Sequence, residues 1–175
     1  MSGITPPYMG QVRPGTCALI SLGNALLHFG LMDEPWDQNS AEFETLVDRA
    51  GCRHGSVIRE LLADIEAEWP ITVAVKAAKD IAEDGVDVEQ SVGPWLRQSI
   101  DRGFVVALPI WDEKIGLHSC LVVDHVNHEY FGGAKGFSYL VINRYPFTEG
   151  VASRLVWKDL GFKPWNVPVV CYRKN

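Results

Sequence analysis

Residues 11–30, QVRPGTCALISLGNALLHFG, join a segment containing proline and glycine to a long apolar run. Apolar residues recur along this run at the spacing of an α-helix, namely Leu19, Leu22, Leu26 and Phe29. We therefore expect a central buried helix from Cys17 to about Phe29, with Gly30 as its C-terminal stop.

Cys17 stands at the first turn of this expected helix. The macrodipole and the unpaired backbone N–H groups at a helix N-terminus favour a thiolate over a thiol. Gln11, six residues earlier, carries an amide that can donate to an oxyanion forming beside the sulfur. The segment predicts a cysteine nucleophile with part of its oxyanion hole attached.

The composition is that of one globular domain spanning residues 1–175, with 47% apolar and 22% charged residues. A net charge of −6 and the lack of a Lys/Arg cluster argue against nucleic-acid binding. The chain has no apolar run long enough to cross a bilayer and does not start like a signal peptide. We expect a cytoplasmic protein without membrane insertion, although export by a dedicated secretion machine is compatible with this sequence.

The four cysteines, Cys17, Cys52, Cys120 and Cys171, are widely separated and form no CxxC pair. This scatter predicts free thiols and argues against a zinc site. We expect no metal and no cofactor, and structural roles for the three later cysteines.

The order of expected elements places helices before strands. We expect helices over 40–50, 56–69 and 94–101, a short strand over 71–76, an acidic loop or short helix over 80–92, strands over 104–110, 118–126, 137–143 and 167–172, a short helix over 153–160 and a hairpin loop over 132–136. Ser40 is the expected N-cap of the first of these helices, and Pro94 is expected in the first turn of the third. The fold class is therefore α+β, with a helical part over 1–101 and a mostly antiparallel sheet over 102–175.

A cysteine nucleophile needs a base within hydrogen-bond reach. His28 lies about three turns along the same expected helix, which is too distant. His54 falls in a polar turn, and His125 and His128 fall at or beyond the end of a strand. His118 follows a turn and begins an apolar strand, where it can face the cysteine helix, so we predict that it is the base.

The base in turn needs an orienting partner. Asn143 ends the next expected strand, and its amide oxygen can accept a hydrogen bond from the His118 ring. Asp124, the competing carboxylate, is six residues beyond His118 on the same strand, about 20 Å away. The sequence therefore favours Asn143.

These residues resemble the papain-like cysteine peptidases, and most of all their C39 and C39-like branch. The resemblance is carried by Gln11 six residues before Cys17, the apolar helix that follows, His118 at a strand start, and 141–146, VINRYP. It implies a papain-like α+β fold, with a helical lobe that carries the nucleophile packed on the sheet. It also implies that Gln11 lies in the oxyanion hole, Cys17 is the nucleophile, His118 acts as base and then acid, and Asn143 orients the imidazole.

The chain departs from that family pattern in three places. Ala18 stands where a glycine commonly follows the nucleophile, and Asn143-Arg144-Tyr145-Pro146 replaces an Asp-Pro pair. The interval from His118 to Asn143 is also longer than usual. The first two departures concern activity rather than fold.

Three functions follow as hypotheses. The first is hydrolysis of a peptide or isopeptide amide in a peptide or protein substrate, through an acyl-enzyme. The second is acyl transfer, as in a transglutaminase-like enzyme, or deamidation on the same fold. The third is a catalytically silent module that binds a peptide or protein. Trp111 and Trp165 are candidates for lining a substrate groove, although tryptophans more commonly pack in the core or at its rim.

Overall fold

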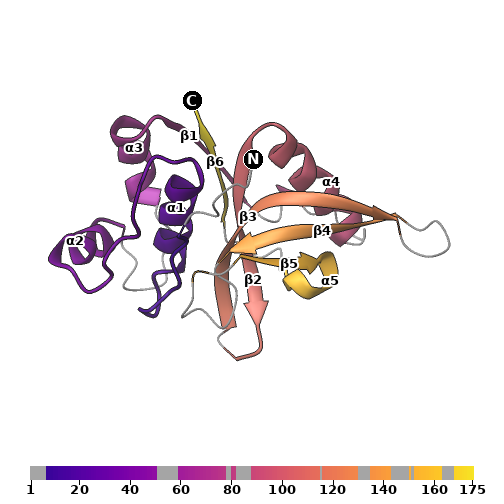
Figure 1. The fold of residues 1–175 in the computed structure, drawn as a ribbon, viewed down its shortest axis with the longest axis horizontal. Helices are drawn as coiled ribbons and strands as arrows, with labels where there is room; N and C mark the ends of the chain where they lie inside the picture. The colour runs from indigo at the N-terminus through magenta and orange to yellow at the C-terminus, as the bar shows by residue number, and fades with distance from the viewer. Residues whose placement is uncertain are drawn as a thin grey trace.

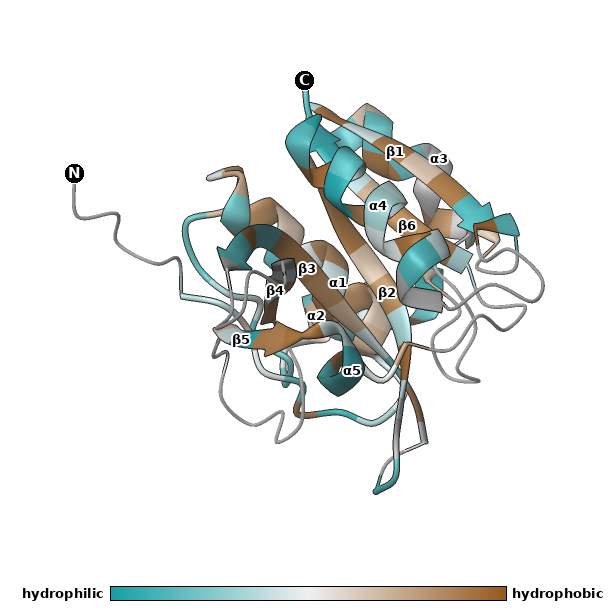
Figure 2. Cartoon of the chain, turned by 90° about the vertical axis from the view of Figure 1, so that its right-hand side faces the viewer, coloured by the Kyte–Doolittle hydropathy of each residue, from teal (hydrophilic) through white to brown (hydrophobic). Residues whose placement is uncertain are grey.

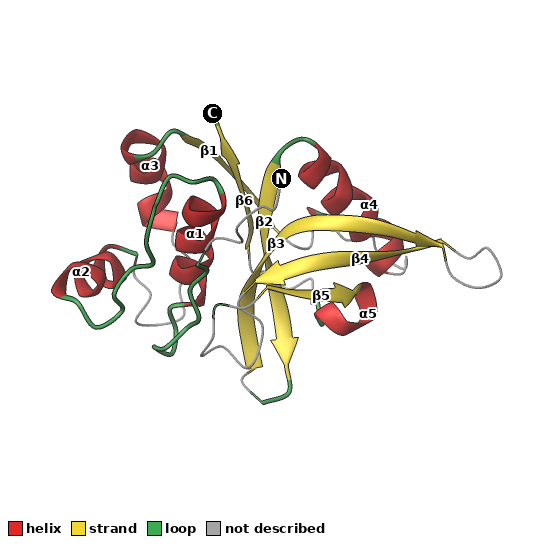
Figure 3. Ribbon diagram, viewed as in Figure 1, coloured by secondary structure: helices red, strands yellow, loops and turns green. Residues whose placement is uncertain are grey.

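One six-stranded sheet organises the chain (Figure 3). The structure is a computed structural model that describes residues 7–50, 59–77, 80–81, 88–114, 116–129, 135–142, 150, 152–162 and 168–175. The strands are β1 (Ile71–Ala77), β2 (Phe104–Asp112), β3 (Gly116–Glu129), β4 (Lys135–Ile142), β5 (Ala152–Val156) and β6 (Pro168–Lys174). Their order is β1-β6-β2-β3-β4-β5, and every neighbouring pair is antiparallel.

Helices lie on both sides of this sheet (Figure 1). On one side are α1 (Cys17–His28), α2 (Ala41–Arg49) and α3 (Arg59–Glu68), and on the other are α4 (Val88–Asp101) and α5 (Trp157–Leu160). Each side has its own apolar cluster, because alternate residues of the central strands point to opposite faces. The predicted α+β class and the packing of the Cys17 helix on an antiparallel sheet are confirmed.

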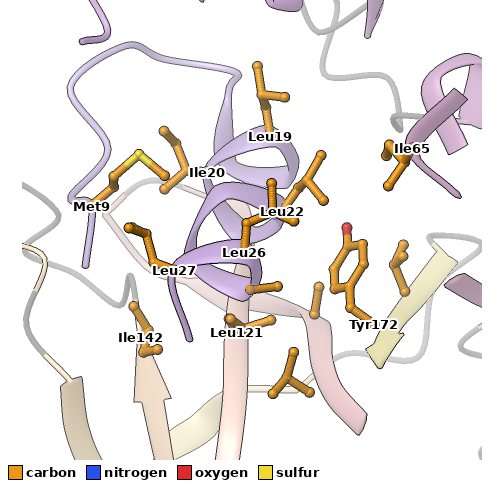
Figure 4. Packing of buried hydrophobic residues seen from close by; sticks show 14 of the residues in the cluster. Met9, Leu19, Ile20, Leu22, Leu26, Leu27, Ile65, Leu121, Ile142 and Tyr172 are labelled. Atoms are coloured by element: carbon orange, nitrogen blue, oxygen red, sulfur yellow. The ribbon is translucent and has the colours of Figure 1, made fainter. Parts of the chain in front are cut away.

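The helix α1 is the centre of the first cluster. All residues from Leu19 to Leu27 are buried, and the helix packs on β3 and β2 (Figure 4). The hydropathy colours of the cartoon in Figure 2 agree, since α1 and the central strands are largely hydrophobic. A helix that is covered on every side is apolar over most of its surface, which explains the largely apolar run in the sequence. Its two buried polar side chains, Ser21 and Asn24, have hydrogen-bond partners.

The end of α1 follows the prediction. Leu31 N–H donates to the Leu26 carbonyl and Gly30 N–H to the Leu27 carbonyl, the pair of bonds that makes a Schellman motif. Gly30 adopts a φ of 63°, which favours glycine. The Ser40 N-cap is also confirmed, because its hydroxyl accepts from Phe43 N–H at 3.1 Å.

The expected start of α4 at Pro94 is wrong. The helix begins at Val88, so Pro94 lies in its interior, where it cannot donate an i to i−4 hydrogen bond. Val92 and Leu96 are fully buried against the sheet, while Pro94 is exposed. The apolar burial of α4 outweighs the local cost of the proline.

The expected helix over 153–160 is also wrong in its first half. Ala152–Val156 form the edge strand β5, which pairs with β4, and only Trp157–Leu160 are helical. The hairpin of β3 and β4 is longer than expected, so that His128 lies within β3, as His125 does, and Lys135 and Gly136 lie in β4 instead of a loop. Pairing between strands extended both segments beyond their apolar centres.

The boundary between a helical and a sheet part is less sharp than predicted. The strand β1 belongs to the first part in sequence but pairs with β6 in the sheet. Cys17, Cys120 and Cys171 are free thiols, and Cys120 and Cys171 are buried in strands, as predicted; Cys52 lies outside the described residues. None of the helices in the described ranges has the length and apolar character needed to span a membrane.

Candidate active site

Cys17 is the first residue of α1, and its sulfur lies against β3. The backbone N–H groups of Ser119, Ala18 and Cys17 itself lie close enough to the sulfur to lower the pKa of the thiol. The helix begins with a hydrogen bond from Ile20 N–H to the Thr16 carbonyl. The expected position of Cys17, at a helix N-terminus and beside the strand that carries His118, is therefore present in the structure.

Burial raises the pKa of the Cys17 thiol above its ordinary value, and the three N–H groups only partly oppose this rise. The N–H groups at the helix N-terminus lower the pKa of Cys17, as expected, but the loss of hydration on burial outweighs them and leaves the pKa raised. A thiol in this position needs a base that takes its proton during attack.

The contact between α1 and β3 is polar at the site. Ser21, one turn beyond Cys17, lies 3.3 Å from Ser119, hydroxyl to hydroxyl. Ser119 and Leu121 thus face α1, while Cys120 lies in the cluster on the opposite face. Strand alternation groups the side chain of His118 with that of Cys120, on the face of the sheet away from α1, and the partner of His118 across the sheet, Ile110, lies in the same cluster. The expectation that His118 faces the cysteine helix is therefore wrong, because its position along β3 sets its side chain on the other face.

His118 is buried, with 4% of its surface exposed. The Cys17 sulfur meets the strand at Ser119 N–H, which is the amide that follows His118. The described pairing of β3 with β4 ends nearby, at Leu121 and Ile142.

Gln11 lies in the loop that leads into α1. Its Nε2 donates to the Arg13 carbonyl at 2.8 Å, and the Thr16 hydroxyl donates to the same oxygen at 2.8 Å. This shared acceptor brings the Gln11 amide next to the residue before Cys17. Nε2 has a second N–H, while Gln11 Oε1 is buried and finds no hydrogen-bond partner among the described residues.

Two buried amide side chains hold the segment that leads into α1, Asn24 at Met9 and Gln38 at the two residues that flank Gln11. Asn24 of α1 pairs with both backbone groups of Met9, accepting from its N–H at 2.7 Å and donating to its carbonyl at 3.1 Å. Gln38 donates to the Gly10 carbonyl at 2.6 Å and accepts from Val12 N–H at 3.0 Å. Sequence reasoning missed both, since neither residue carries a local pattern that names its partner.

An ion pair holds the same loop from outside. Arg13 contacts Glu44 of α2 at 2.5 Å, and its guanidinium lies 6.0 Å from the centre of the Phe43 ring. The Arg13 carbonyl, which accepts from both Gln11 and Thr16, is thereby connected to α2.

Trp111 lies at the end of β2, opposite Leu117 of β3. Both are exposed, by 44% and 43%, and they are two positions along the strands from the pair of Pro109 and Ser119. Side chains two positions apart share a face and lie about 7 Å apart. Trp111 and Leu117 therefore make an apolar surface on the α1 face beside Ser119. Trp165 and Asn143, the other predicted site residues, lie outside the described residues.

The remaining described histidines have partners away from Cys17. His28, at the far end of α1, bonds to the Tyr8 hydroxyl at 3.0 Å. His125 lies 2.9 Å from Asp101, and His128 lies 2.6 Å from the Ser138 hydroxyl. Asp124 pairs with Arg154 at 3.0 Å. In the described part of the chain no group of His, Cys, Asp and Glu side chains could hold a metal ion.

No protein-family model matches the chain, and no curated protein matches it with significant similarity. One similar solved structure is described as a crystal structure analysis of SERA5E from Plasmodium falciparum. The identity is 14% and the TM-score 0.35, with 59% of this chain and 49% of that chain covered. The matched part is thus about half of that protein's length, and a likeness at this level carries no argument about function.

Proposed function

We propose that the protein is a cysteine-dependent hydrolase that resembles the papain-like, C39-like peptidases and cleaves a peptide or isopeptide amide. One observation carries the proposal: the Cys17 sulfur faces Ser119 N–H, the amide next to His118, while Gln11 Nε2 is held beside Thr16. In this proposal the nucleophile, the base and the oxyanion donor come from three distant parts of the chain. The His118 imidazole has to reach the sulfur around the edge of β3, because strand alternation sets its side chain on the face away from α1.

In this mechanism His118 takes the Cys17 proton as the sulfur adds to the substrate carbonyl carbon. The electron pair of the C=O bond moves to oxygen, and the second N–H of Gln11 and the Cys17 backbone N–H stabilise the charge. The C–N bond then breaks, and the leaving amine takes the proton from His118. Water adds to the thioester, gives a proton to His118, and releases the acid and the Cys17 thiol.

The raised pKa of Cys17 fits a thiol that is neutral before attack, so His118 acts as a general base that takes its proton during the reaction. The substrate in this proposal is a peptide or protein chain, and the catalytic domain is the whole of 1–175. We also propose a cytoplasmic location, which fits the three free thiols that the structure describes.

The test is labelling with a peptide vinyl sulfone, whose electrophilic carbon reacts with an activated thiol. We expect a stable adduct on Cys17 in the wild type, none at that position in Cys17→Ala, and a loss of rate of about 100-fold or more in His118→Ala. His125→Ala, on the same strand, is the matched control and should label like the wild type. Equal adduct formation in all four proteins would overturn the proposal.

A second candidate, a catalytically silent module that binds a peptide, is favoured by two observations. The Cys17 thiol has a raised pKa and Gln11 Nε2 already donates to a backbone carbonyl. This candidate predicts that Cys17→Ala leaves binding of peptides unchanged and that the wild type forms no adduct.

A further inference from the structure

We infer that Gln38 is a positioning residue for the oxyanion donor Gln11. The inference rests on the proposed function, because it concerns how that site is assembled. Gln38 is distant from Cys17 in the sequence, and we do not expect it to touch a substrate. Its role is to hold the backbone on both sides of Gln11.

The geometry is a bridge across one residue. The Gln38 side chain donates to the carbonyl of Gly10 at 2.6 Å and accepts from the N–H of Val12 at 3.0 Å. Gly10 and Val12 flank Gln11, so both of its neighbours are held by a single amide. Gln38 itself is buried, with 7% of its surface exposed. A buried amide with both ends satisfied keeps one orientation, because any other leaves polar groups without partners.

On the side of Gln11 that leads to α1, apolar packing does not provide this restraint. Val12 is 62% exposed, so its side chain does not anchor the loop. After Gln11, the Arg13 carbonyl receives the Gln11 and Thr16 donors and leads into α1. Two sets of hydrogen bonds therefore set where the Gln11 amide lies. Gln38 holds the backbone of its neighbours, and the Arg13 carbonyl accepts from its side chain. An oxyanion donor has to be placed to within a few tenths of an ångström, which makes such a restraint valuable.

The chain offers a matched control. Asn24 makes the same kind of two-sided bridge, also buried, but to the two backbone groups of Met9. Gln38→Glu and Asn24→Asp each replace a buried amide donor by a carboxyl of the same shape. Both cost stability, while only the first acts on the residues that flank Gln11.

The experiment compares two reactions of Cys17 in the intact protein. A peptide aldehyde, N-acetyl-Leu-Leu-norleucinal, adds to the thiol to give a hemithioacetal whose oxygen needs the oxyanion donor. Iodoacetamide alkylates the same sulfur by displacing iodide and makes no oxyanion. For Gln38→Glu at pH 8 we expect aldehyde affinity to fall about tenfold while the alkylation rate stays within about twofold of wild type. Asn24→Asp should change the two reactions by the same factor.

The pH dependence of aldehyde binding by Gln38→Glu gives a second test, because protonation should restore the lost hydrogen bond. When protonated, the carboxyl in Gln38→Glu can donate to the Gly10 carbonyl and accept from Val12 N–H, as the amide does. Its aldehyde affinity relative to wild type should therefore recover as the pH falls from 8 to 5. A Gln38→Glu affinity equal to that of the wild type at pH 8 would overturn the inference alone. Failure of the wild type to bind the aldehyde would overturn the proposed function, and this inference with it.

Discussion

The sulfur of Cys17 faces the backbone N–H of Ser119, the residue that follows His118 on the central strand β3. This contact joins the first turn of the buried helix to the sheet at the position where sequence reasoning expected a base. The groups near the sulfur are backbone N–H groups. The surroundings of the sulfur therefore depend on where α1 lies against β3 and not on the identity of one side chain.

Cys17 is expected to titrate as a buried thiol. Because burial raises its pKa, alkylation of Cys17 by iodoacetamide should reach half its maximal rate above the ordinary thiol value of about 8.5. Peptide mapping by mass spectrometry over pH 6–10 measures this for each cysteine. Cys171 is the internal control, since burial raises its pKa to about 12 and it should stay unlabelled. A Cys17 midpoint below pH 7 would instead show a preformed thiolate and contradict this account.

Trp111 and Leu117 are expected to contact substrate. Trp111→Ala should weaken binding of the Leu-containing peptide aldehyde about fivefold, the loss expected when part of a large apolar side chain is no longer buried by a ligand. The alkylation rate of Cys17 should stay unchanged, because the contact is with the peptide and not the sulfur. Val75→Ala, at a 42% exposed position on the distant strand β1, is the control. Equal losses in the two variants would rule out a specific contact.

Local sequence patterns are sufficient to predict an element such as α1, whose bounds follow from its own residues. The helix α1 is largely apolar and ends at a glycine with positive φ, so periodicity and one turn residue predict it. Pro94 and the strand β5 were misjudged for a different reason. In both, a contact with a distant part of the sheet decides the structure and overrides the local preference.

The site divides in the same way. Cys17, Gln11 and His118 could be named from residue type and spacing, because each has a recognisable role in acyl transfer. The partners that hold them could not. Gln38 lies 26 residues from Val12 and 28 from Gly10, and an amide side chain can bond to any backbone. The pKa of Cys17 was also misjudged, since the depth of burial depends on the packing of α1 against β3.

Gly23 is expected to tolerate no side chain. A Cβ there would lie 2.1 Å from Met9 Cε and 2.8 Å from the Trp36 ring. Gly23→Ala should therefore lower the free energy of unfolding by about 1–3 kcal/mol in urea titrations. Adding Met9→Ala removes the shorter contact and should make the combined loss smaller than the sum of the two single losses. Strict additivity would show that the two residues do not press on each other.

A second glycine gives the control for that cycle. Gly30 has a φ of 63° and no atom within 4 Å of a Cβ built there. Gly30→Ala should cost about 1 kcal/mol through backbone strain alone, and Met9→Ala should add to this cost independently.

The pair of His28 and Tyr8 is expected to make stability depend on pH. Burial lowers the pKa of His28 below its ordinary 6.5, and the charge of Asp124 only partly opposes this. Well above pH 6.5 the His28 imidazole is neutral in the folded and the unfolded chain, so it adds no pH dependence to stability. In the folded chain its Nδ1, when unprotonated, accepts a hydrogen bond from the Tyr8 hydroxyl. As the pH falls below 6.5 the unfolded chain takes up a proton that the folded state refuses, so stability falls until the lower folded pKa is passed.

The measurement is the free energy of unfolding of the wild type and of His28→Asn at pH 7.5 and pH 5. Asparagine keeps an acceptor for the Tyr8 hydroxyl but does not titrate, so the wild type should lose more stability than the variant, by no more than about 1.4 kcal/mol per pH unit. Tyr8→Phe keeps His28 and should retain a pH dependence of the same sign. If His28→Asn loses as much stability as the wild type between these pH values, then His28 does not titrate with folding and other groups carry the pH dependence.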